Sequence, residues 1–148
     1  MNASLLEIIP VMMIGVMVFP LFWGGVVTLI SYMSGWQGLA ARYAAETDAV
    51  QQTRRFRSLA IRNKSLPSNY SGVVTFGVSE TSLFISLMIL FRMGHKPLEI
   101  PFSDLSIKKH AGLFDRQAFV TVDGFPRLTL IVSMKDIEWI EAAYEALS

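Results

Sequence analysis

The sequence contains no cysteine, and this absence excludes a disulfide framework, a zinc site with thiolate ligands and a thiol nucleophile. It also contains no GxGxxG segment, no Walker loop and no GxSxG segment. His95 and His110 are its only histidines, and neither stands at HxxxH or HExxH spacing. We interpret both as surface histidines. We therefore expect no cofactor, no metal ion and no enzymatic activity.

The net charge of +1 is too small to indicate a polyanionic partner. Aromatic residues that could stack on bases beside a basic groove are also missing from the pattern, so we expect no nucleic-acid partner.

Charged residues are nearly absent from the segment before Arg42, where Glu7 is the only one. The run from Ile8 to Met33 carries no charge at all. A helix rises about 1.5 Å per residue, so about 20 apolar residues cross a bilayer core about 30 Å thick. Pro10 falls near the start of this run, whereas Pro20 is interior and predicts a kink. The pattern predicts a transmembrane helix over residues 1–33.

Two alternatives to a membrane span exist. One is a buried helix of a soluble domain, but such a helix rarely continues past about 20 residues without a charge. The other is a signal peptide, which needs a basic start and a shorter apolar stretch, although Gly38 and Ala40 resemble the small residues before a cleavage site. Cleavage therefore remains the minor alternative.

Basic residues near a span predict its orientation, because positive charges stay on the cytoplasmic side. The N-terminal flank has none, whereas the C-terminal side has Arg42, Arg54, Arg55, Arg57, Arg62 and Lys64. We expect the N-terminus outside and residues 34–148 in the cytoplasm.

The segment "SGWQGLAARY" begins a region, residues 34–52, that we interpret as a juxtamembrane amphipathic helix and linker. Ser34 and Gln37 have capping-box spacing, which predicts that this helix starts at Ser34. An apolar stripe follows, and with Tyr32 it suits the membrane interface: Trp36, Leu39, Ala40 and Tyr43. The alternative is that the same stripe packs on the downstream domain.

Residues 53–148 change to the period of two that is typical of strands. Seven short strands are expected, with a hairpin at Asp123–Gly124 in which both turn residues have positive φ. A C-terminal helix follows, capped by Ser133 and Asp136, with an apolar stripe of Ile137, Ile140, Tyr144 and Leu147. Its solvent side carries Asp136, Glu138, Glu141 and Glu145.

This element order predicts an α+β fold: an N-terminal transmembrane helix followed by a pleckstrin-homology-like (PH-like) antiparallel β-barrel or sandwich that a C-terminal helix caps. The segments "SGWQGLAARY" and "VVTFGVSETSLFISLMILFRMGHKPLEIPFSDL" resemble a group of small bacterial membrane proteins with one N-terminal span and a PH- or GRAM-like β domain. The resemblance implies the bacterial inner membrane and no catalytic residue.

Two surfaces are candidates for function. In "SLFISLMILF", read as one strand, Leu83, Ile85, Leu87 and Ile89 would face the core and Phe84, Met88 and Leu90 would face outward. That outer face predicts a docking site, or else a strand covered by the protein's own linker. The second surface is the basic cluster of Arg54, Arg55, Arg57, Arg62 and Lys64, which predicts contact with anionic lipid or an ordinary positive-inside flank.

Two functions follow from these surfaces. The first is a membrane-anchored accessory or scaffold protein, a subunit of a membrane complex that binds a protein partner through its β domain and its span. The second is sensing of lipid headgroups by the β domain.

Overall fold

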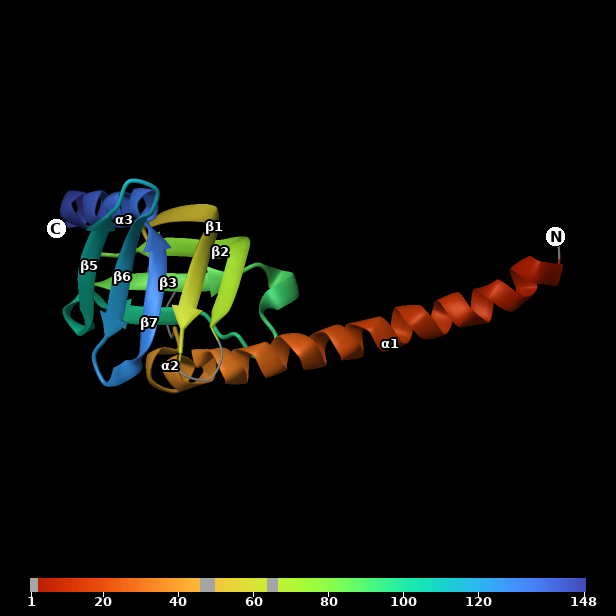
Figure 1. Cartoon of the computed structure of the whole chain (residues 1–148). Coiled ribbons are helices and arrows are strands. Elements are labelled where there is room, and N and C mark those ends of the chain that lie inside the picture. The colour runs from red at the N-terminus through yellow and green to blue at the C-terminus, as the bar shows by residue number, and fades with distance from the viewer. Residues whose placement is uncertain (1–2, 46–49, 64–66) are drawn as a thin grey trace.

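The computed structural model describes residues 3–45, 50–63 and 67–148 (Figure 1). Within them, a long N-terminal helix leads into a β domain with a helix at each end of its sheet (Figure 1). The helices are α1 (Ala3–Ser34), α2 (Trp36–Tyr43) and α3 (Met134–Leu147). The strands are β1 (Gln52–Arg62), β2 (Ser68–Val78), β3 (Ser82–Leu87), β4 (Leu98–Pro101), β5 (Leu105–Ala111), β6 (Arg116–Val122) and β7 (Phe125–Ser133). Two short 3-10 helices, η1 (Ile89–Phe91) and η2 (Phe102–Asp104), flank β4.

The described strands form one antiparallel sheet of seven strands in the order β4-β3-β2-β1-β7-β6-β5. The sheet curls into a half-barrel, with β1 pairing with β2 and, near its end, with β7 (Figure 1). The predicted α+β class, the seven strands and the C-terminal helix are confirmed. The PH-like assignment stays a prediction.

The core lies inside the curl, because alternate residues of each strand point inward. Alternate residues of β6 and β7 are buried there, among them Val120 and Leu130. Figure 1 shows α3 across one end of the sheet and α2 across the other. Ile137 and Ile140 of α3 and Trp36 and Leu39 of α2 close the two ends of this core.

The predicted hairpin at Asp123–Gly124 forms between β6 and β7, but only Gly124 has positive φ, at 84°. The ladder shifts register beside it, between Thr121 and Val122, so the turn does not need the mirror-image conformation at both residues.

The run "SLFISLMILF" is not one strand. β3 ends at Leu87, and η1 follows, so Ile89 is 77% exposed instead of facing the core. The helix α1 continues through Pro20 as a single α-helix, and the predicted kink is only the gentle curve visible in Figure 1.

Candidate membrane interface

The helix α1 has two parts that differ in burial. Every side chain from Ser4 to Phe22 is exposed. From residue 23 on, one face of the helix packs on the β domain, through Gly24, Val27, Ser31 and Ser34. These positions are three or four apart, which places them on one face of a helix. Among the described helices, only α1 is long and apolar enough to cross a membrane.

The segment around η1 contacts the part of α1 that packs on the β domain. The Trp23 indole N–H donates a hydrogen bond of 2.8 Å to the Leu90 carbonyl. The ring of Trp23 meets the ring of Phe91 edge-on, with centroids 5.3 Å apart. A side chain on Gly24 would overlap the sulfur of Met93. Gly24 therefore leaves room for the end of the Met93 side chain against α1.

The carbonyl of Gly94 also holds α1 against the β domain. It accepts hydrogen bonds from the Ser31 hydroxyl and, at 2.5 Å, from the Gln37 side-chain amide. Gly94 has φ 69°, and a Cβ there would lie 3.1 Å from the Thr28 Cα, so glycine suits both the conformation and the close approach. Gln37 therefore ties α2 to the same carbonyl that holds α1.

The predicted capping box at Ser34 and Gln37 is wrong. Gly35 is the N-cap of α2, with φ 91°, and α1 continues through Ser34. The Gln37 side chain points to Gly94 instead of returning to the backbone of Ser34. A left-handed glycine lets the chain turn between two helices without an unstructured linker.

The residues predicted to lie at the membrane interface differ in burial. Trp36 and Leu39 are fully buried and Tyr43 is 6% exposed, all inside the core of the β domain. The stripe therefore packs on the downstream domain, and its assignment to the membrane interface is wrong for these three residues. Tyr32, by contrast, is 66% exposed on the opposite side of α1. Periodicity identified the apolar face of α2 but could not tell which surface covers it.

His95 lies in a buried polar cluster and not at the surface, where it was expected. It is 1% exposed, and its ring meets the ring of Trp36 at 5.2 Å. Its Nδ1 lies 3.1 Å from the Met93 carbonyl, which can only accept, so Nδ1 carries the proton. Its Nε2 lies 2.9 Å from the Tyr70 hydroxyl, which is also 3.0 Å from Ser34 Oγ. Burial lowers the pKa of His95, so the neutral ring is favoured.

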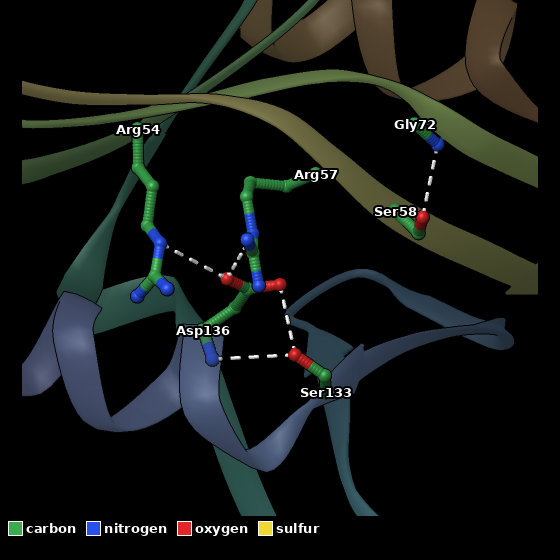
Figure 2. Close-up of polar contacts among 6 residues, drawn as sticks. All are labelled: Arg54, Arg57, Ser58, Gly72, Ser133 and Asp136. Carbon is green, nitrogen blue, oxygen red and sulfur yellow. Dashed lines mark hydrogen bonds and ion pairs between the residues drawn. The ribbon is translucent and has the colours of Figure 1, made fainter.

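The basic residues of β1 do not form one cluster. Arg57 Nε lies 2.6 Å and Arg54 Nε 3.6 Å from the same oxygen of Asp136, as Figure 2 shows. Asp136 is 1% exposed, so its placement on the solvent side of α3 is wrong. Its second oxygen accepts a hydrogen bond of 2.8 Å from Ser133, whose hydroxyl accepts one from the Asp136 N–H and caps α3 as predicted.

A β-bulge explains why two arginines three positions apart point the same way. The ladder pairs Arg54 with Phe76 and Arg57 with Val74, so β1 has one residue more than β2 in this stretch. Phe56, inside the bulge, has a left-handed φ of 57° and is 69% exposed. In the following stretch of the same ladder, the Ser58 hydroxyl accepts a hydrogen bond from Gly72 N–H (Figure 2).

The remaining basic residues separate in space. Arg54 and Arg57 lie beside α3, at the end of the sheet opposite α2 and α1 (Figure 1). Arg55 is exposed in β1, whereas Arg62 ends that strand and places its guanidinium 5.6 Å from the centre of the Phe119 ring. Lys64 lies outside the described residues. The basic residues that are close in sequence are therefore spread along the β domain by an extended strand.

The residues of the expected docking face also differ in burial. Phe84 is only 6% exposed, and both its Cβ and the side chain of Val50, which precedes β1, lie close to Gly77, so Phe84 is not part of an open face. Met88 and Leu90 are 37% and 63% exposed. Two further exposed neighbours, Ile89 and Met93, were not predicted from the sequence. The sequence feature that could have indicated their exposure is the length of the apolar run, which exceeds that of one short strand.

Among the described residues, no group of three or more His, Asp or Glu side chains could hold a metal ion. No protein-family model matches the chain, and no curated protein matches it. The site is therefore defined by its geometry: an apolar helix whose C-terminal part is built into a β domain.

Proposed function

We propose that this protein is a non-enzymatic, single-pass membrane protein whose β domain serves as an accessory or scaffold subunit of a membrane complex. One observation carries the proposal: α1 and the domain form one unit, while the opposite face of the docked part of α1 stays apolar and exposed. That face consists of Leu29, Tyr32 and Met33, which are 42–66% exposed. A flexible tether would be enough to localise a domain, whereas a rigid joint also positions it for a partner.

Burial supports a retained anchor over a cleaved signal peptide. A cut after Gly38 or Ala40 would remove Trp36, which is fully buried among the rings of Tyr70 and His95. The indole N–H of Trp36 also donates to the Lys96 carbonyl at 2.9 Å. Cleavage would therefore leave a hole in the core of the released domain.

The orientation is proposed with the N-terminus outside and the β domain in the cytoplasm, because no Lys or Arg precedes Arg42. Since the chain has no cysteine, single cysteines can report this directly in intact cells. A membrane-impermeant thiol reagent should leave a cysteine at Leu113 unmodified until the membrane is opened. Modification before opening would reverse the orientation but would leave the anchor in place.

Site-specific photo-cross-linking in native membranes tests the partner. A photoreactive residue at Met33, on the exposed apolar face, should give one discrete adduct with a second membrane protein. The same residue at Glu138, exposed on α3, is the matched control and should give none. Met33→Asp should abolish the association in mild detergent. Adducts only between two copies of this chain, or none at all, would contradict an accessory role.

Lipid-headgroup sensing remains a second candidate because of a depression of about 570 Å³ on the outer face of β5, β6 and β7. Its lining includes Arg62, Lys108, His110 and Phe119. Cationic side chains around an open groove attract phosphate groups. Among the basic residues expected to contact lipid, only Arg62 lines this groove in the described part of the chain.

Titration of the full chain in neutral detergent with inositol phosphates tests this candidate. Lys108→Glu should remove the binding, and Lys135→Glu, an exposed charge on α3, should not. Equal binding by both variants would show that only the overall charge matters and would reject the groove as a site.

A further inference from the structure

We propose that Met88–Met93, named here the η1 loop, enters the membrane interface beside α1 and forms a second contact with the bilayer. The inference rests on the proposed membrane span and adds a surface of the β domain to it.

The first argument is length. The fully exposed part of α1 runs from Ser4 to Phe22. At about 1.5 Å per residue, a helical segment of this length is about 28 Å long, close to a bilayer core of about 30 Å. Its only charged residue, Glu7, lies close to its N-terminal end, far from the β domain, where a span would place it near the headgroups. If this part spans the core, the boundary of the hydrocarbon on the side of the β domain falls at Trp23. That residue is where the η1 loop meets the helix.

The second argument is the chemistry of the loop. Ile89, Leu90 and Met93 are 77%, 63% and 54% exposed, and none of the η1 residues is buried. Large apolar side chains beside a membrane helix at the level of the interface suit the headgroup–hydrocarbon boundary. The Trp23 indole, whose N–H is already bonded to Leu90, suits the same depth.

The third argument is charge. Arg92 and Lys96 accompany the apolar residues of the loop in sequence, and both are exposed. Arg92 Nε donates a hydrogen bond of 2.9 Å to the Leu87 carbonyl, which holds the guanidinium group beside the end of β3. Arginine and lysine at the edge of an inserted apolar loop can reach lipid phosphates while the apolar side chains enter the acyl region. A lipid surface therefore matches both the apolar and the charged residues of the loop.

The test uses the absence of cysteine from the chain. Single cysteines are placed at Leu90 in the loop, at Val16 in α1 and at Leu113 in the β5–β6 hairpin beside α3. Each is labelled with an environment-sensitive fluorophore in the full chain, which is reconstituted in vesicles of neutral and anionic phospholipid. Quenching is measured with lipids brominated at shallow or deep positions of the acyl chain. Ile89→Cys is the second variant if Leu90→Cys does not reconstitute.

We expect the label at Leu90 to emit at shorter wavelength than the label at Leu113, and to be quenched at least twofold more by shallow than by deep bromines. The label at Val16 should be quenched by deep bromines, and the label at Leu113 by neither. If Val16 is quenched but Leu90 behaves like Leu113, the loop lies in water and the inference fails while the span stands. If Val16 is not quenched, the proposed anchor itself fails. A blue-shifted Leu90 label that no lipid quenches would show that a second copy of the chain covers the loop, and would also overturn the inference.

Discussion

At the scale of single residues, one buried carboxylate joins the bulge of β1 to the start of α3. Replacing Asp136 with Asn keeps the size of the side chain but leaves Arg54 and Arg57 without their counter-charge. Removing one member of a buried ion pair costs about 3–5 kcal/mol, and the cost is lower here because both arginines are near 30% exposed. We expect Asp136→Asn to lower the free energy of unfolding by about 2 kcal/mol, within the range of harmful substitutions. Urea denaturation followed by circular dichroism measures it.

The matched control is Glu138→Gln, an exposed carboxylate on the same helix, which should change stability by less than about 0.5 kcal/mol. Equal effects of the two substitutions would mean that the ion pairs of Asp136 do not stabilise the fold.

His95 makes stability depend on pH. Burial lowers its pKa below the ordinary 6.5, so in the unfolded chain it takes up a proton at a pH where the folded chain does not. Above about pH 6.5 both states are neutral and His95 contributes nothing; as the pH falls below about 6.5, stability is lost. We expect His95→Gln to show a smaller loss of Tm between pH 7 and pH 5 than the natural chain. His110→Gln, at an exposed position, should keep the natural dependence.

Phe56 combines a left-handed backbone with an exposed side chain. Asparagine tolerates this conformation better than phenylalanine. We expect Phe56→Asn to raise the free energy of unfolding by about 0.5–1 kcal/mol, measured by the same urea titration. A loss of stability would show that the ring contributes contacts that outweigh the backbone strain.

At the scale of elements, the joint between α1 and α2 depends on one glycine. Gly35 has φ 91°, and a Cβ there would lie 2.6 Å from a methyl carbon of Leu128. We expect Gly35→Ala to lower the free energy of unfolding by about 2 kcal/mol, since left-handed strain and the clash add. The control is Gly38→Ala in α2, where the nearest atom is 3.7 Å away and alanine favours the helix. Similar stability of both variants would show that the joint tolerates a change of angle.

Local patterns predicted the elements well, and contacts distant in sequence decided the site. The period of two identified the strands of the β domain, and the Ser133–Asp136 spacing identified the start of α3. The bulge at Phe56 could not be predicted, because one extra residue reverses which side chains point to α3. Its consequence was that Arg54 and Asp136 were both assigned to solvent or lipid. The burial of Trp36 was also undetermined, because its partners Tyr70 and His95 come from other parts of the chain.

At the scale of the whole molecule, the proposed anchor and the β domain share a boundary inside α1. We expect a chain that begins at residue 23 to fold, because it keeps Trp23, Ser31 and every core residue of α2. A chain that begins at residue 41 lacks Trp36 and Leu39 and should not reach a cooperative fold, since each lost core side chain costs about 3–5 kcal/mol. Thermal unfolding of both fragments in the same detergent measures this difference. Cooperative unfolding of the shorter fragment would show that α2 is dispensable.

If α1 spans a bilayer as proposed, the packing of its last residues on the β domain leaves no flexible link between the spanning part of the helix and the domain. A helix adjusts its tilt when the thickness of the surrounding bilayer changes. A flexible linker would not transmit this tilt to the domain. Here the β domain is packed against α1, so it would tilt together with the helix. The height of the far end of the domain above the membrane, and the orientation of that end, would then depend on the thickness of the bilayer around the helix.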